Sequence, residues 1–317
     1  MTSLPYSDAI APAAASRARP AADVPARRDR IVGALFVAPL VVALLVTTLY
    51  PTLFLIALAT TKSTLGKPFR KFVGTDQFVA TLTDGNFQIA VAKSIAFAFA
   101  SATVEVVVGF LVALAFVTLL RLGRTLLVIA LLPLMTPPVM VAVAWKLILA
   151  PAGGLLNGML MKAGIIDAPL SFLATPFLAW LSIGVADLWQ WVPFVAILSF
   201  AALVSLPDGV QEAAMVDGAS PLQRLRHITL PLVAAPLASI FLLKLIIGFK
   251  LFDLVYVLTF GGPGFATTTA TFGIWRLALE QFDVGNAAAE TLVYAIVIGI
   301  VTIPVVRLHR FASENQP

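Results

Sequence analysis

The chain has 317 residues, of which 60% are hydrophobic and 12% are charged, and its mean hydropathy is +0.99. Soluble domains carry about a quarter charged residues, so this composition excludes an ordinary soluble protein and indicates an integral membrane protein. The formal net charge is +5, but the basic residues lie mainly in tails and loops without interleaved aromatics, so we expect no nucleic-acid partner. The chain has no cysteine, which excludes disulfides and thiolate metal sites.

The sequence also lacks the residue patterns of an enzyme. Its two histidines, His227 and His309, lie far apart and predict no metal site. No phosphate-binding loop for ATP occurs, and neither paired carboxylates nor a nucleophile triad can be found. We therefore expect no catalytic residue, no metal ion and no cofactor bound by this chain.

The N-terminal segment, residues 1–30, is rich in Ala, Pro and Arg and has no hydrophobic periodicity, so we expect a disordered tail. Three arginines between 27 and 30 directly precede the first apolar run. That run is too long for a signal peptide and has no convincing cleavage site, which predicts a retained signal-anchor helix. The expected membrane domain covers 31–310, and 311–317 form a second short tail.

Six apolar runs are long enough to cross a membrane, because about twenty residues span the ~30 Å hydrocarbon core of a bilayer. The runs are Ile31–Leu58, Ser94–Leu120, Leu126–Leu149, Phe177–Val204, Leu232–Phe260 and Ala287–Val306. They predict an all-α membrane protein with six transmembrane helices. No internal repeat is visible, which disfavours a secondary transporter built from inverted repeats.

The basic residues also predict an orientation. The arginine cluster at 27–30 precedes the first span, and such a cluster favours the cytoplasmic side. With six spans, this rule places both termini and the polar stretch 205–231 in the cytoplasm.

The stretch 205–231 is a polar island between two apolar runs and has the pattern of two short helices. Pro207 can begin the first helix, and Gly218 can end it. Ser220 is followed by Pro and, three residues later, by Gln, which predicts a capping box at the start of the second helix. We expect the Leu-Pro pair at 230–231 to end that helix. A preorganised helix-turn-helix of this kind suits docking of another protein.

This stretch closely resembles the EAA loop of ABC importer permeases, whose pattern is EAA, three residues, G, and then an I-x-L-P ending. The matching residues here are Glu212-Ala213-Ala214, Gly218 and Ile228-Thr229-Leu230-Pro231. Two other stretches resemble carbohydrate permeases: the run from Asp187 to Phe194 before the loop, and Thr259-x-Gly261-Gly262-Pro263, which is similar to the MalF-like subunit. The similarity covers about residues 31–310.

The resemblance implies the ABC type I importer permease fold and a multi-pass subunit of the cell inner membrane. Its partners would be a second, MalG-like permease, a dimer of ATP-binding subunits that carry ATP and Mg²⁺, an extracytoplasmic solute-binding protein and membrane lipid. The solute would be a sugar, oligosaccharide or polyol, and alternating access would move it. The residues that couple to the ATPase would be Glu212, Ala213, Ala214, Asp217 and Gly218.

The predicted solute path centres on Lys244, in the middle of the fifth apolar run. An uncompensated lysine there costs ~2.5–3.5 kcal/mol on insertion scales, and such a residue is a functional candidate that should face the protein interior. Lys244, Gly248 and Leu251 would share one helix face through their spacing. The resemblance implies that these positions contact the solute. It assigns the same role to Gln190, Trp191 and Phe194. Gly and Leu replace the polar residues expected at 248 and 251, so the ligand would differ from maltose.

Other interpretations of these residues stay open. Lys244 could form a structural ion pair with Glu105, Asp187 or Asp253, or point toward the partner permease. Trp191 could belong to the aromatic belt at the membrane surface. For the whole chain, the alternatives are an ABC permease for a non-carbohydrate solute, an ion-coupled secondary transporter and a non-transporting scaffold.

Overall fold

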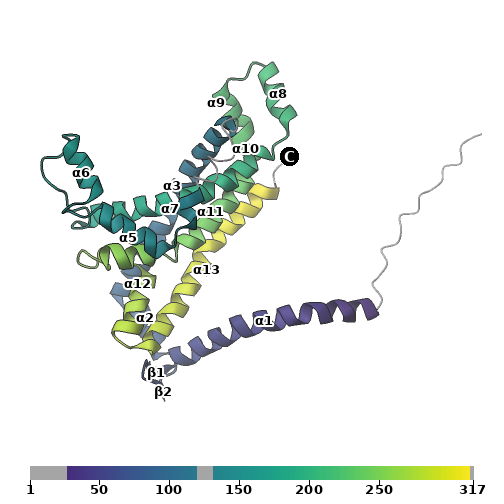
Figure 1. The fold of residues 1–317 in the computed structure, drawn as a ribbon. Coiled ribbons are helices and arrows are strands. Elements are labelled where there is room, and N and C mark those ends of the chain that lie inside the picture. The colour runs from purple at the N-terminus through teal and green to yellow at the C-terminus, as the bar shows by residue number, and fades with distance from the viewer. Residues whose placement is uncertain (1–26, 120–130, 315–317) are drawn as a thin grey trace, which may run out of the picture. The chain divides into compact units, whose positions relative to one another are not determined.

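The computed structural model describes residues 27–119 and 131–314. It divides into two compact units, residues 1–53 and 54–317, and Figure 1 traces both. The tail predicted at 1–30 and the start of the third apolar run lie largely outside the described residues.

The first unit holds most of α1 (Arg27–Ala59), a 33-residue helix that contains Pro39 and Pro51. Threonine hydroxyls along this helix bond to its own backbone. Thr47 donates to the carbonyl of Ala43 at 2.8 Å, and Thr52 donates to Thr48 at 2.7 Å. These bonds satisfy the hydroxyls within the helix, which suits a segment that crosses lipid.

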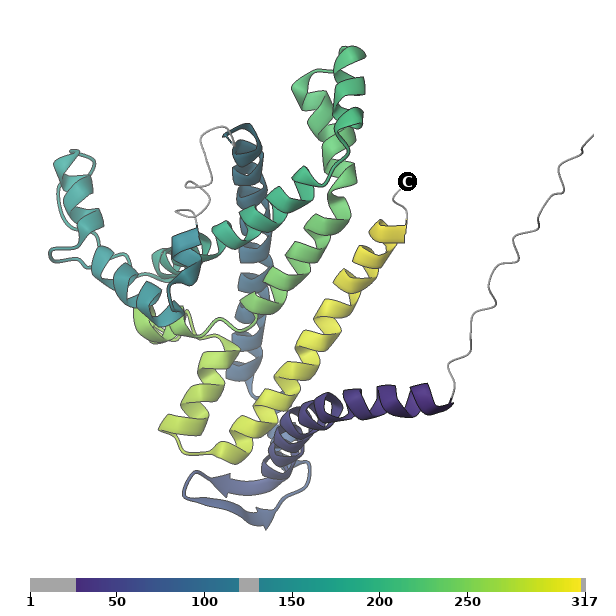
Figure 2. The same ribbon diagram turned by 45° about the vertical axis from the view of Figure 1, so that its right-hand side comes forward.

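The second unit is built around the long helices α3 (Gly85–Leu119), α7 (Pro176–Val204) and α13 (Val284–Glu314) and the shorter α11 (Ala234–Gly248). α3 packs along α7, while α11 packs against both α3 and α13 (Figure 2). Two glycines allow these close contacts. A Cβ at Gly109 would lie 2.5 Å from Cγ1 of Val195 on α7, and one at Gly248 would lie 2.9 Å from Cα of Ala98 on α3.

Shorter elements connect the long helices. They are α2 (Asp76–Thr83), α5 (Pro138–Ile148), α6 (Leu155–Lys162), α8 (Asp208–Val216), α9 (Pro221–Arg224), α10 (Leu230–Leu232) and α12 (Ala270–Trp275), with π-helical segments at Leu225–Thr229, Val255–Thr259 and Arg276–Glu280. In both views α8 and α9 lie at one end of α11, and α12 lies toward the other end (Figures 1 and 2). The short helices α8 and α9 and the short helix α12 therefore lie toward opposite ends of α11.

The prediction of an all-α protein was wrong in one place. β1 (Thr61–Thr64) and β2 (Lys67–Phe72) form an antiparallel hairpin in which Thr61 pairs with Phe72. The side chain of Gln77 on α2 donates to the carbonyl of Thr61 at 2.9 Å and fixes the base of the hairpin. The strands are short and β2 is exposed along its whole length. They therefore lack the alternation of buried apolar residues that indicates a strand in a sequence.

Four described helices are long and apolar enough to span a membrane: Ala34–Ala59, Gly85–Val117, Pro176–Val204 and Val284–Arg307. A fifth candidate span is the pair Pro221–Leu232 and Ala234–Gly248, which is bent by 67°. The third predicted run contributes the apolar helix α5 from its second half. Because residues 120–130 lie outside the described part of the chain, the count of six spans stays a prediction.

The predicted end of the second loop helix, at Leu230-Pro231, was also wrong. Helical backbone continues through Pro231 to Leu232, and the break follows at Val233. The π-helical segment just before Pro231 explains this, since the N–H of Leu230 already bonds to the carbonyl of Leu225 in an i→i−5 pattern. The altered hydrogen-bond register accommodates a residue that has no N–H to donate.

Candidate functional site

The predicted coupling residues lie on α8 and in the turn that follows it. The N–H of Gly218 bonds to Met215 at 3.1 Å, and the N–H of Ala219 bonds to Ala214 at 3.0 Å. This pair of bonds is the Schellman arrangement that ends a helix, and it places Gly218 in the left-handed region at φ 77°. A side chain at Gly218 would meet nothing within 4 Å. Backbone conformation alone therefore favours glycine there and disfavours most other residues.

The second loop helix begins with the predicted capping box, which the structure confirms. The N–H of Ser220 donates to Oε1 of Gln223 at 2.8 Å, and the N–H of Gln223 donates to Oγ of Ser220 at 3.3 Å. One further bond joins the two helices of the loop, from Nε2 of Gln211 to Oγ1 of Thr229 at 3.0 Å. The loop is therefore held in shape by its own residues.

The predicted coupling residues differ in exposure. Glu212, Ala213, Asp217 and Gly218 are exposed, whereas Ala214 is buried within the loop. The sequence reasoning missed two apolar side chains beside them: Val216 is 87% exposed and Leu222 is 71% exposed. Val216 follows Glu212 by four residues on α8, so this helix presents an exposed apolar side chain next to that carboxylate.

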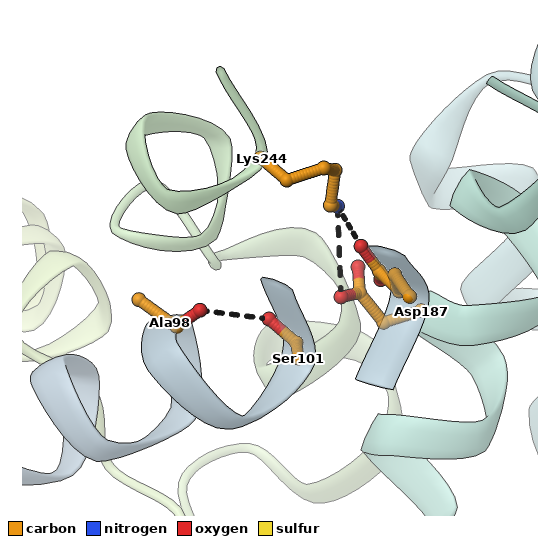
Figure 3. A network of polar contacts seen from close by, with 5 residues as sticks. Ala98, Ser101, Asp187 and Lys244 are labelled. Atoms are coloured by element: carbon orange, nitrogen blue, oxygen red, sulfur yellow. Dashed lines mark hydrogen bonds and ion pairs between the residues drawn. The ribbon is translucent and has the colours of Figure 1, made fainter. Parts of the chain in front are cut away.

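The charged side chain of Lys244 is completely buried and meets two carboxylates. Its Nζ lies 2.7 Å from Oε2 of Glu105 on α3 and 4.0 Å from Oδ2 of Asp187 on α7. Glu105 is 1% exposed and Asp187 is 6% exposed. Figure 3 shows Lys244 extending from α11 toward Asp187, beside the turn of α3 that carries Ala98 and Ser101. These three charged residues, hereafter the charge cluster, join three helices.

Aromatic rings complete this environment. Nζ of Lys244 lies 4.4 Å from the centroid of the Trp191 ring, which is a cation–π distance. The ring of Phe194 packs edge-on against Trp191, with centroids 5.9 Å apart. The structure thus brings together Lys244, Trp191 and Phe194 from the predicted solute path. Of the ion-pair partners considered for Lys244, Glu105 and Asp187 are the ones it contacts.

Gln190 and Gly248 occupy packing positions. Gln190 is buried, and its Nε2 donates to the carbonyl of Thr136 at 3.2 Å. Gly248 faces α3, where Ala98 lies in close contact with it. The role of these two residues in solute contact stays a prediction.

The helical spacing assumed for Leu251 was wrong. α11 ends at Gly248, so Leu251 lies beyond the helix and does not continue the face of Lys244. Its carbonyl accepts hydrogen bonds from the hydroxyls of Thr269 and Thr271, at 3.1 and 2.6 Å. In this arrangement Leu251 anchors the segment that precedes α12.

A cavity of about 520 Å³ lies between α3 and α7. Phe97 and Trp180 contribute aromatic walls, with ring centroids 5.5 Å apart. Ser101 and Glu105 add polar groups, so the cavity reaches the charge cluster through Glu105. Gln190, Trp191, Phe194, Gly248 and Leu251 are not among its lining residues. Phe97, Ser101 and Glu105 follow one another at four-residue spacing on α3, a signal that could have revealed this face in the sequence.

Comparison with known proteins places these features in a family. Residues 105–313 match the family described as binding-protein-dependent transport system inner membrane component. The trehalose/maltose transport system permease protein MalF of Thermococcus litoralis is 31% identical over 291 residues, which are 90% of this chain and 96% of that protein. The chain belongs to this family of permeases.

The name of a second relative gives a different solute. The sn-glycerol-3-phosphate transport system permease protein UgpA of Escherichia coli O157:H7 is 31% identical over 240 residues, which are 74% of this chain and 78% of that protein. The permease described here is accordingly a multi-pass inner-membrane component of an ABC importer, not a catalytic subunit. ATP hydrolysis belongs to a separate subunit, and a periplasmic binding protein delivers the solute.

Solved structures share the fold. A bacterial ABC transporter involved in the import of the acidic polysaccharide alginate aligns with a TM-score of 0.77 and 23% identity, over 89% of this chain and 96% of that chain. The MetNI methionine ABC transporter aligns with a TM-score of 0.53 and 16% identity, over 71% of this chain and 95% of that chain. At these identities the likeness establishes the architecture of the permease.

Removing the ammonium group from the charge cluster should destabilise the permease. Lys244→Met leaves two carboxylates buried without a cation, and breaking a buried ion pair from one side costs about 3–5 kcal/mol. We expect a lower yield and a lower melting temperature of the assembled transporter. Lys250→Met is the matched control, because Lys250 is exposed just beyond the end of α11. Equal stability of the two variants would contradict a stabilising role for the cluster.

Proposed function

We propose that this permease imports a sugar, an oligosaccharide or a polyol. The observation that carries the proposal is the similarity to a trehalose/maltose permease over 90% of the chain. The aromatic walls of the cavity between α3 and α7 support it, because such rings suit the apolar faces of a sugar. Lys244, Trp191 and Phe194, together with Gln190, Gly248 and Leu251, remain the proposed contacts along the path.

A second candidate is import of a non-carbohydrate solute. The relation to the glycerol-3-phosphate permease favours it, since the identity is the same and only the coverage is smaller. Both candidates use the same fold and the same loop. They differ in the solute that the cognate binding protein captures, so calorimetric binding of sugars, polyols and phosphate esters to that protein discriminates between them.

In the proposed assembly, this chain and a second, MalG-like permease form the translocation path by alternating access. A dimer of ATPase subunits lies on the cytoplasmic side and binds ATP and Mg²⁺. The membrane domain is 31–310 with six spans, and the tails 1–30 and 311–317 are cytoplasmic together with the loop 205–231. The arginine cluster at 27–30 supports this orientation.

Cysteine labelling tests the orientation directly, since the chain has no cysteine of its own. Leu222→Cys and Leu65→Cys introduce thiols at positions that are 71% and 53% exposed. A membrane-impermeant thiol reagent should label position 65 in intact cells and position 222 only after the membrane is opened. The reverse pattern would overturn the proposed orientation.

The loop 205–231 is proposed to seat in a groove of the ATPase. Glu212 and Ala213 are exposed on α8, and Val216 and Leu222 add apolar surface beside them. A small side chain at Ala213 lets a partner approach the helix closely. A buried charge-assisted hydrogen bond from a basic partner to the carboxylate of Glu212 would contribute roughly 1.5–3 kcal/mol.

Coupling variants test this role. Gly218→Val forces a β-branched residue to φ 77° and should deform the turn, at a cost of about 1–2 kcal/mol. Gly218→Asn should be tolerated, because asparagine adopts this conformation. Glu212→Ala removes the proposed charged contact, and Gly209→Ala, at an open position on the same helix, is its control.

The measurement is ATP hydrolysis by the purified transporter, with and without sugar-loaded binding protein, together with co-purification of the ATPase. We expect Gly218→Val and Glu212→Ala to lose stimulation or association, while Gly218→Asn and Gly209→Ala retain both. Full association and full stimulation in Gly218→Val and Glu212→Ala would refute the coupling role. Stimulation by sugar-free binding protein alone would instead speak against carbohydrate import.

A further inference from the structure

The charge cluster contains one cation and two anions. Glu105 and Asp187 both approach the same atom, Nζ of Lys244, at 2.7 and 4.0 Å. Among the described residues, neither carboxylate forms an ion pair with any other basic side chain. If both carboxylates were ionised, the cluster would carry one uncompensated negative charge.

The protein groups described around the cluster offer little to disperse such a charge. Lys244 and Glu105 are among the largest fully buried side chains of the described chain. Ile183 and Ala186, one turn or less before Asp187, are fully buried as well. The Trp191 ring faces the ammonium, and the negative face of an aromatic ring stabilises a cation but not a carboxylate. An isolated carboxylate in such a place neutralises itself when it can.

The hydrogen bonds of the cluster are also incomplete. Both carboxylate oxygens of Glu105, Oδ2 of Asp187 and Nζ of Lys244 lack a hydrogen bond of good geometry among the described residues, although Nζ lies 2.7 Å from Oε2. A carboxylate can only accept hydrogen bonds, whereas a protonated carboxyl also donates one. One additional proton would remove the excess charge and would give one carboxyl a hydrogen to donate to the other.

We propose that Glu105 and Asp187 together hold one proton in this arrangement, so that the cluster of α3, α7 and α11 is electrically neutral. Two carboxylates that share a buried site bind protons as a pair, so the proton belongs to both and not to one residue. A metal cation fits less well, because the ammonium already occupies the point between the carboxylates and would repel it. The shared proton belongs to the permease itself and does not depend on which solute is transported.

Amide variants follow from this charge count. Glu105→Gln or Asp187→Asn leaves one carboxylate facing one ammonium, which is neutral without the extra proton. Each single variant should therefore assemble at the wild-type level. The double variant leaves Lys244 without an anion, and its yield should fall several-fold. Glu280→Gln is the control, because Glu280 is partly exposed and pairs with Arg276 at 3.3 Å.

Infrared spectroscopy of the assembled transporter at neutral pH detects the proton itself. The wild type should show the C=O stretch of a protonated carboxyl that shifts in D₂O. Either single amide variant should lack this band, and Glu280→Gln should keep it. ¹³C-labelled aspartate or glutamate shifts the band in the wild type, so the test does not depend on a variant that folds.

Three results would overturn the proposal. The first is a wild-type spectrum without a protonated carboxyl. The second is a band that persists unchanged in both single amide variants. The third is a melting temperature that rises with sodium concentration in the wild type but not in the single amide variants, which would identify a metal cation as the neutralising charge.

Discussion

The buried ammonium of Lys244 is the constraint on which the arrangement of the membrane helices depends. An ammonium group cannot stay charged inside an apolar bundle unless anions lie against it. Here the anions come from two other helices, Glu105 on α3 and Asp187 on α7. The charges therefore specify which face of α11 turns toward those helices. The close contact of Gly248 with Ala98 on α3 favours the same rotation of α11.

Close packing of α11 against α3 brings Lys244 within reach of its carboxylates. Gly248 brings the backbone of α11 against Ala98 of α3. Gly248 lies one turn after Lys244 on α11, and Ala98 lies two turns before Glu105 on α3. The second helix of the loop joins α11 directly at the break at Val233, where the two are bent by 67°. A displacement of the loop would therefore be transmitted along α11 toward the charge cluster. This is a physical route by which docking of a partner at the loop could alter the path between α3 and α7.

The sequence was most informative where local chemistry decides the structure. Gly218 and the capping box at Ser220 were predictable because a helix end has few solutions, and each needs particular residues at particular positions. Four of the six predicted spans were predictable for a similar reason, since lipid demands length and hydrophobicity. The end of the second loop helix was not predictable, because a π-helical segment changed the effect of Pro231.

Features that depend on tertiary contacts escaped prediction. The sequence named Glu105 and Asp187 only as two of several partners for Lys244, because helix packing chooses among them. Leu251 was assigned to the wrong face because nothing local indicates that α11 ends at Gly248. The cavity between α3 and α7 was missed because its aromatic walls resemble ordinary span residues, and its lining depends on how two distant helices meet.

A charge exchange tests the central claim most directly. Lys244→Glu and Glu105→Lys, made separately, each place like charges together in a dry site and should abolish assembly of the transporter. Made together, they restore one ammonium between two carboxylates, and assembly measured by co-purification of the partner subunits should recover to a large fraction of the wild-type level. If the double variant assembles no better than either single variant, or if the single variants assemble normally, the charges do not position these helices.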